Sequence, residues 1–185
     1  MQTEIIIAGF GGQGVLFAGQ LMAYAALDEG MEVSWIPSYG PEMRGGTANC
    51  TVIIADEEIG SPTVNHPKAA VVFNLPSFDK YEPLVAPGGV LIANQSLINR
   101  DFERDDLIKA MIPANEIAEN IGNKRLTNMV MLGALLEALP VLSVASVQKT
   151  LEIHLPQRHK HLLPLNAQAL EQGAELVKKQ LAGVH

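Results

Sequence analysis

The stretch Ile5-Ile6-Ile7-Ala8-Gly9-Phe10-Gly11-Gly12-Gln13-Gly14 contains the signal that decides the fold. Its first four residues, which are apolar and mostly β-branched, predict a strand that is buried on both faces. The glycines that follow have the spacing G-x-G-x-x-G, and an apolar helix is predicted from about residue 13 to residue 29. A strand that leads through a glycine-rich turn directly into a helix is typical of α/β proteins with a parallel sheet.

The same alternation of strands and helices continues through the first two thirds of the chain. Further strands are predicted, from apolar runs bounded by turn residues, at 32–36, 47–55, 69–74, 90–93 and 111–113. A short helix is predicted at 77–85, whereas the polar segment 95–106 is ambiguous. Because the strands at 5–8 and 32–36 flank a helix, we expect them to form a parallel βαβ unit with a right-handed crossover.

The C-terminal third is predicted to be helical. Helices are expected at 115–121, at 126–139, after a cap at Ser143, and from a cap at Asn166 to about residue 181, with a polar connector at 157–164. The helix at 126–139 is apolar all round, so we expect it to lie in the core and to pack against another subunit as well, with Gly133 allowing close helix packing. The prediction is therefore one α/β domain over 1–185, Rossmann-like and three-layered, with a mostly parallel sheet and additional C-terminal helices.

Charge and cysteine content exclude several classes of function. The formal net charge is −7 and no basic stripe is present, which argues against binding to nucleic acid or to an anionic membrane. The single cysteine, Cys50, cannot form an internal disulfide, a zinc site or an iron–sulfur cluster, and it fits a reducing cytoplasm. Its place in an alternating strand predicts a buried, inert thiol.

Targeting and metal-binding patterns are also not found in the sequence. The first residues have no basic region of the kind that begins a signal peptide, and the most apolar later run, 129–136, is too short to span a bilayer. His159 and His161 lie in a polar segment among cations, so we expect no metal site there. The expected location is the cytoplasm.

The glycine-rich turn admits two interpretations. Gly9, Gly11, Gly12, Gln13 and Gly14 lie where backbone N–H groups at a helix start could contact an anionic ligand or a partner. A nicotinamide site would also require an acid at the end of the second strand, but that strand ends in 36–39 without one, which disfavours a dehydrogenase. The alternative is that these glycines serve only helix–sheet packing.

A second glycine-rich segment follows the second strand. It reads Ser38-Tyr39-Gly40-Pro41-Glu42-Met43-Arg44-Gly45-Gly46-Thr47, and its glycines bracket two charged residues. Ligands of open α/β sheets bind outside the carboxyl ends of the strands, so Arg44, Gly45 and Gly46 are candidate binding residues. A surface loop without a ligand is the alternative.

A third segment, Gly122-Asn123-Lys124-Arg125-Leu126-Thr127-Asn128-Met129, completes a set of motifs. The three together, in this order and spacing, resemble the gamma subunit of 2-oxoacid:ferredoxin oxidoreductases over nearly the whole chain. The form of the second motif is most similar to the 2-oxoglutarate branch, with the pyruvate and branched-chain branches as near neighbours. The resemblance implies oxidative decarboxylation of a 2-oxoacid on thiamine diphosphate, electron transfer through iron–sulfur clusters to ferredoxin, and acyl transfer to coenzyme A.

The resemblance also implies a division of labour between subunits. The chain has no Gly-Asp-Gly motif for thiamine diphosphate and Mg²⁺, and too few cysteines for a cluster, so these cofactors are expected on the alpha, beta and ferredoxin-like delta subunits. The chain is thus expected to hold no cofactor and to be inactive alone, with coenzyme A as co-substrate of the complex. It could contact coenzyme A through the glycine turn and Arg44, or it could brace the other subunits.

Two further expectations concern the isolated chain. Its sparse charge suggests an exposed interface, so we expect it to form a homodimer when expressed alone. The alternative to the oxidoreductase reading is a stand-alone nucleotide-binding or regulatory module of similar fold.

Overall fold

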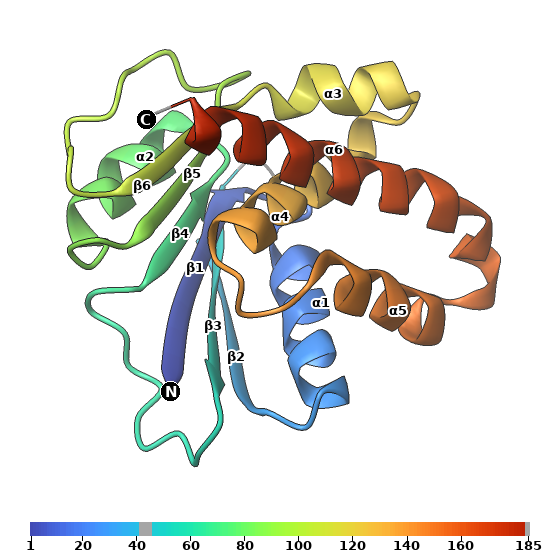
Figure 1. The fold of residues 1–185 in the computed structure, drawn as a ribbon, viewed down its shortest axis with the longest axis horizontal. Helices are drawn as coiled ribbons and strands as arrows, with labels where there is room; N and C mark the ends of the chain where they lie inside the picture. Colours follow the sequence, from blue (N-terminus) through green and yellow to red (C-terminus); the bar gives the residue numbers. More distant parts are fainter. Residues whose placement is uncertain (41–45, 184–185) are drawn as a thin grey trace.

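The computed structural model describes residues 1–40 and 46–183, which form a mixed six-stranded sheet with helices on both faces (Figure 1). The strand order is β2-β3-β1-β4-β5-β6. The strands are β1 (Gln2–Phe10), β2 (Glu32–Tyr39), β3 (Thr47–Ala55), β4 (Ala69–Val72), β5 (Val90–Asn94) and β6 (Ile108–Ile112). The pairs β1–β4, β4–β5 and β5–β6 are parallel. The predicted α/β class with a mostly parallel sheet is therefore confirmed.

The strands at 5–8 and 32–36 run parallel, as expected of a βαβ unit, but another strand lies between them. β3 lies between β1 and β2 and is antiparallel to both, so that Cys50 faces Ile7 on one side and Pro37 on the other. β1 and β2 consequently run in the same direction without pairing. A hairpin explains this arrangement, because β2 and β3 are joined by a short segment and pair with each other first along the chain.

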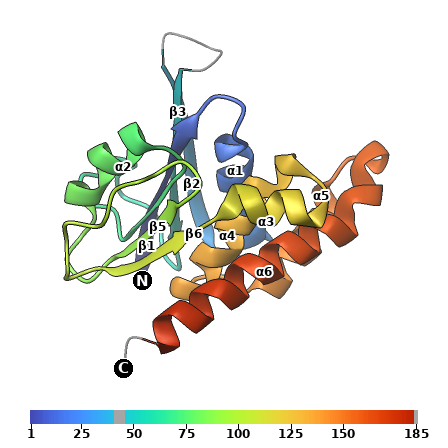
Figure 2. The ribbon, with the colours of Figure 1, turned by 90° about the horizontal axis from the view of Figure 1, so that it is seen from above.

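The helices cover the two faces of the sheet unequally (Figure 2). α1 and α4 lie directly on one face, and α5 and α6 pack outside them, whereas the other face is covered by α2 and the segment 95–107. The helix bounds are α1 Val15–Asp28, α2 Leu75–Tyr81, α3 Ala114–Ile121, α4 Thr127–Ala138, α5 Val144–His154 and α6 Leu163–Ala182. Short 3-10 helices lie at η1 Glu82–Leu84, η2 Lys124–Leu126 and η3 Gln157–Leu162.

One of the two predicted helix caps is correct. The hydroxyl of Ser143 accepts a hydrogen bond from the N–H of Ser146 at 2.9 Å and caps α5 as expected. Asn166, in contrast, lies inside α6 and donates to the carbonyl of Leu162 at 2.9 Å. Pro164 lies in the first turn of α6, where its fixed φ favours a helix start, so the helix begins three residues before Asn166.

α4 and α6 approach each other unusually closely. A Cβ atom at Gly133 of α4 would lie 1.9 Å from the carbonyl oxygen of Leu170, and one at Gly173 of α6 would lie 1.9 Å from that of Val130. The two glycines thus let the backbones touch, which confirms the expected role of Gly133. All of α4 except Thr127 and Glu137 is buried by elements of this chain, so the predicted packing of this helix against another subunit is wrong.

Candidate functional site

The glycine turn connects β1 to α1 at the edge of the sheet where the parallel strands end. Gly14 precedes the helix in the left-handed conformation, with a φ of 74°, which a residue with a side chain rarely adopts. The side-chain oxygen of Gln13 accepts a hydrogen bond from the N–H of Phe10 at 2.6 Å. The Gln13 side chain therefore stabilises the turn through a hydrogen bond to the turn's own backbone.

The glycines of the turn divide into two kinds. A Cβ at Gly9 would lie 2.8 Å from the Cβ of Phe73, and one at Gly14 would lie 2.4 Å from the side-chain nitrogen of Asn128. These two positions allow close packing, as the structural interpretation of the motif expects. Gly12 has a φ of 92° and no atom within 4 Å of a Cβ position, so its backbone borders open space. This part of the turn is available to a ligand.

The second motif lies directly beside the turn. The N–H of Gly11 donates to the carbonyl oxygen of Gly46 at 2.9 Å, and the N–H of Gly40 donates to that of Thr47 at 2.7 Å at the end of the hairpin. Arg44 and Gly45, which the sequence places among the binding residues, lie outside the described residues. The described residues on either side of the loop nonetheless join the first two motifs, through the backbone hydrogen bond between Gly11 and Gly46.

The third motif reaches the turn from the other side. Gly122 ends α3 in the left-handed conformation, and the side chain of Asn123 accepts from the N–H of Arg125 at 3.0 Å at the start of η2. Asn128, in the first turn of α4, is buried, and its amide nitrogen donates to the carbonyl of Gly14 at 3.2 Å. This hydrogen bond joins residues that are 114 positions apart in the chain.

A polar cleft of about 180 Å³ lies between the turn and the third motif. Lys124, which also pairs with Glu119 at 3.1 Å, and Arg125 contribute two cationic side chains, and among the described residues no acidic side chain lines the cleft. Its lining residues are Gly12, Gln13, Asn115, Lys124, Arg125 and Thr127. Asn115 is held in place by the amide of the fully buried Asn94, whose nitrogen lies 3.1 Å from its oxygen. Cations and hydroxyl and amide groups around a glycine backbone suit a phosphate or another small anion.

The predicted binding residues thus have different places in the structure. Gly12 and Gln13 line the cleft, whereas Gly9, Gly11, Gly14 and Gly46 support the backbone around it. The cationic pair Lys124 and Arg125 was not among the predicted site residues. The signal was available in the third motif, which contains both residues, but their position opposite Gly12 depends on the folded chain.

Cys50 is separate from the cleft. It is fully buried on β3 beneath α1, and its Sγ lies 3.7 Å from the carbonyl oxygen of Val15. Burial raises the pKa of this thiol to about 12, so the expectation of a buried, inert cysteine is confirmed. In the described part of the chain, no three histidine, cysteine or acidic side chains are grouped as a metal site would require. Likewise, over residues 1–40 and 46–183 no helix has the length and apolarity to cross a membrane.

Comparison with known proteins identifies the family. The family model described as pyruvate ferredoxin/flavodoxin oxidoreductase matches residues 4–176, which contain all three motifs. The chain belongs to this family. The resemblance expected from the motifs is therefore confirmed, and the chain is of the gamma-subunit type.

Curated relatives at 35–38% identity are named for two different substrates. The chain is 38% identical over 184 residues to the ketoisovalerate oxidoreductase subunit VorA of Methanothermobacter marburgensis, covering 98% of this chain and 38% of the relative. The chain thus spans about two fifths of the length of that relative. It is 35% identical over 184 residues to the 2-oxoglutarate synthase subunit KorC of Methanocaldococcus jannaschii, covering 97% of this chain and 96% of the relative.

Solved structures have the same fold. The gamma subunit of a keto/oxoacid ferredoxin oxidoreductase from Geobacter sulfurreducens superposes with a TM-score of 0.81 at 28% identity, over 96% of this chain and 99% of that one. The 2-oxoglutarate:ferredoxin oxidoreductase of Magnetococcus marinus, solved with 2-oxoglutarate, coenzyme A and succinyl-CoA, superposes with a TM-score of 0.87 at 24% identity, over 96% of this chain and 31% of that one. This second likeness concerns the fold alone.

Proposed function

We propose that this chain is the gamma subunit of a complex that oxidatively decarboxylates a 2-oxoacid, passes the acyl group to coenzyme A and reduces ferredoxin. Membership of the family supports the proposal. The chain's own residues do not fit the redox cofactors, because its one cysteine is buried with a pKa of about 12 and it has no Gly-Asp-Gly motif. Thiamine diphosphate, Mg²⁺ and the iron–sulfur clusters are therefore assigned to alpha, beta and delta partner subunits in the cytoplasm.

The cleft between the glycine turn and the third motif carries the proposal for this subunit's own role. We infer that it binds a phosphate of coenzyme A, which contains a pyrophosphate and a ribose phosphate. Lys124 and Arg125 supply positive charge, and the turn at Gly12 brings the backbone close without a side chain in the way. Since the cleft measures only about 180 Å³, it holds one end of the cofactor, and the thiol extends toward the partner subunits.

The role of the cleft is testable in the assembled complex. Arg125→Ala and Lys124→Ala should each raise the apparent KM for coenzyme A by about tenfold or more, because a charge-assisted contact to phosphate contributes roughly 1.5–3 kcal/mol. The KM for the 2-oxoacid and the subunit composition should not change. Lys178→Ala, which removes an exposed lysine of α6 away from the cleft, serves as the matched control.

Two results would decide against coenzyme A binding. An unchanged KM for coenzyme A in both variants means that the cofactor does not contact these side chains. Loss of partner subunits from the variant complexes means that the cleft serves assembly, which is the alternative role of the three motifs.

2-Oxoglutarate is the substrate that we propose first. The support is the form of the second motif, Ser38 to Gly46, together with 35% identity to a 2-oxoglutarate synthase subunit. The 38% identity to a ketoisovalerate oxidoreductase subunit supports a branched-chain 2-oxoacid as the second candidate. Purification of the complex from its native host, followed by assay against 2-oxoglutarate, 2-ketoisovalerate and pyruvate, distinguishes them by kcat/KM.

A further inference from the structure

Two side-chain amides line the cleft beside the glycine turn, those of Gln13 and Asn115. An amide carries an acceptor oxygen on one side and an NH₂ donor on the other, so its orientation determines which ligand atoms it can bind. Both residues are partly buried, so that each amide contacts the protein as well as the cleft. The hydrogen bonds on the protein side therefore determine which group each amide presents to a ligand.

A backbone donor sets the orientation of Gln13. Its Oε1 accepts from the N–H of Phe10 at 2.6 Å, and because a backbone N–H only donates, this amide atom has to be the oxygen. The Nε2 group makes no hydrogen bond within residues 1–40 and 46–183. Gln13 therefore presents donor N–H groups to the cleft.

A second asparagine, Asn94, sets the orientation of Asn115. Asn94 is fully buried at the end of β5, and its Oδ1 accepts from the backbone N–H of Ser96 at 3.3 Å. Its Nδ2 then donates to the carbonyl oxygen of Phe73 at 3.4 Å and to Oδ1 of Asn115 at 3.1 Å. Because the two backbone groups fix Asn94, Asn115 has to turn its oxygen inward. The Nδ2 of Asn115, which has no hydrogen-bond partner among the described residues, is left for the cleft.

The charged groups near these amides leave Arg125 as the main positive charge of the cleft. Lys124 shares its charge with Glu119, and the carboxylate of Glu116 accepts from a nearby hydroxyl group. Arg125 has no acidic partner in the described part of the chain. The hydroxyl of Thr127 donates to the carbonyl of Lys124 at 3.1 Å. The cleft thus combines a guanidinium with two amides whose oxygens are already occupied.

We propose that Gln13 and Asn115 bind an oxyanion in this cleft through their NH₂ groups, and that Asn94 is a positioning residue that holds Asn115 as a donor. The inference rests on the proposed binding of a phosphate in the cleft and adds the groups that make the cleft selective. Both amide oxygens are occupied on the protein side, so a ligand that has to donate N–H groups finds no amide acceptor there. Several donors around one guanidinium suit a phosphate group, whose unprotonated oxygens accept hydrogen bonds.

Amide NMR spectra of the full chain, recorded during titration with inorganic phosphate at constant ionic strength, test the proposal. The side-chain NH₂ signals of Gln13 and Asn115 should both shift and then saturate. Gln13→Glu and Asn115→Asp each retain the oxygen that the protein side requires and place a second, anionic oxygen toward the cleft. Each should weaken phosphate binding at least about tenfold, because a donor is replaced by an acceptor that repels the anion. Asn120→Asp adds the same charge at an exposed position of α3 and serves as the matched control.

The positioning role of Asn94 has its own measurement. In Asn94→Asp the carboxylate can still accept from the N–H of Ser96 but has no N–H to donate, so Asn115 should turn over and give its NH₂ group to this side chain. The NH₂ signal of Asn115 should then stop responding to phosphate, whereas that of Gln13 should still shift. A purely structural role would affect both signals alike. Asn94→Ser, a second variant that places no charge in the core, should likewise reduce the response of Asn115 alone.

Three results would overturn the proposal. Wild-type NH₂ signals that do not move show that these amides bind no phosphate. Unchanged affinity in Gln13→Glu and Asn115→Asp shows that the anion is bound elsewhere. An undiminished Asn115 response in both Asn94 variants removes the positioning role. The test with coenzyme A is separate: if Gln13→Glu and Asn115→Asp weaken phosphate binding by the chain but leave the KM for coenzyme A of the complex unchanged, the anion site is supported and coenzyme A is not its ligand.

Discussion

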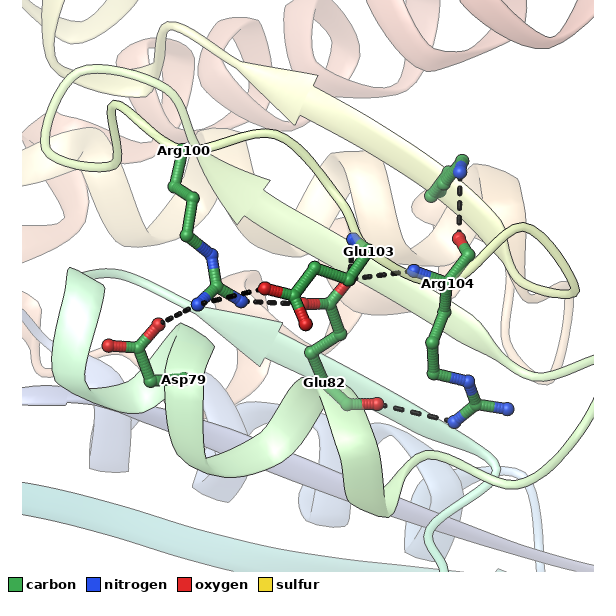
Figure 3. A network of polar contacts seen from close by, with 6 residues as sticks. Asp79, Glu82, Arg100, Glu103 and Arg104 are labelled. Atoms are coloured by element: carbon green, nitrogen blue, oxygen red, sulfur yellow. Dashed lines mark hydrogen bonds and ion pairs between the residues drawn. The ribbon is translucent and has the colours of Figure 1, made fainter.

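The two faces of the sheet are stabilised by different kinds of interaction. On one face, α4 and α6 pack through apolar side chains and two glycines that bring their backbones into contact. On the other face, the segment 95–107 combines apolar contacts of Ile98, Phe102 and Leu107 with polar contacts to Glu82, whose side chain is only 2% exposed (Figure 3). The first face should therefore be sensitive to the size of side chains, and the second to their charge as well.

The polar face has Glu82 at its centre. One carboxylate oxygen lies 2.7 Å from the guanidinium of Arg100, and the other accepts from the backbone N–H groups of Glu103 and Arg104 at 2.7 and 3.3 Å (Figure 3). The Arg100 guanidinium also pairs with Asp79 at 2.6 Å and lies 4.7 Å from the centre of the Phe78 ring. The segment 95–107 contains no helix or strand, and the contacts to this buried carboxylate hold it in place instead.

The largest effect is expected at the glycine pair of the apolar face. Gly133→Ala should destabilise the protein by about 3 kcal/mol, because the added Cβ would lie 1.9 Å from a backbone oxygen that can move only with α6. On helix propensity alone the same substitution would stabilise the protein by about 1 kcal/mol. A loss of stability would therefore show that the contact between the two backbones outweighs helix propensity. Urea denaturation measures the difference. Gly60→Ala is the control, since no atom lies within 4 Å of its Cβ position.

The next effect is expected at Glu82. Glu82→Ala should lower the free energy of unfolding by about 2 kcal/mol, because it leaves two backbone N–H groups without their acceptor and removes the buried carboxylate that pairs with Arg100. Hydrogen exchange should accelerate in the segment 95–107 and remain slow in α4 and α6. Equal acceleration in both regions would show that the two faces do not open independently. Glu103→Ala removes a mostly exposed carboxylate of the same network and should change stability little.

The sequence predicted the apolar face better than the polar one. The apolar helix at 126–139 and the role of Gly133 could be read from residue pattern alone, because helical period and glycine spacing are local properties. The segment 95–106 was ambiguous because its conformation depends on Glu82, which lies about 20 residues earlier and forms its contacts only in the folded chain. The place of β3 between β1 and β2 could not be read from the sequence for the same reason, because strand pairing depends on contacts between distant residues.

The site shows the same division between local and long-range information. The glycine turn and its left-handed Gly14 follow from a strand, a spacing and a helix that are contiguous in sequence. The cleft needs Lys124 and Arg125, which are more than 110 positions away, and the hydrogen bond from Asn128 to Gly14 brings them there. Motifs found separately in the sequence therefore became a site only when the fold placed them together.

A smaller and pH-dependent effect is expected at the edge of the polar face. The Arg104 guanidinium beside Asp106 lowers the pKa of this carboxyl below its ordinary value. In the unfolded chain the same group titrates near pH 4, so its contribution to stability is complete above that pH and disappears as the pH falls through the lower pKa of the folded state. The difference in melting temperature between wild type and Asp106→Asn should be small at pH 7 and vanish near pH 2. Asp101→Asn, which removes an exposed carboxylate for which the described residues include no ion-pair partner, is the matched control.

The last prediction concerns the reactivity of the Cys50 thiol beneath α1 and involves no change in the stability of the protein. Because burial raises the pKa of Cys50 to about 12, almost none of it is thiolate at pH 8, and a disulfide reagent should react only when α1 lifts from the sheet. The expected result is negligible reaction in buffer and one equivalent in guanidinium chloride. A chain with Thr63→Cys adds an exposed thiol that should react within minutes. Gly133→Ala, on the same face of the sheet as Cys50, should accelerate this reaction more than Glu82→Ala on the other face. Equal acceleration by both variants would show that the two faces are coupled, and the independence inferred from their different contacts would be wrong.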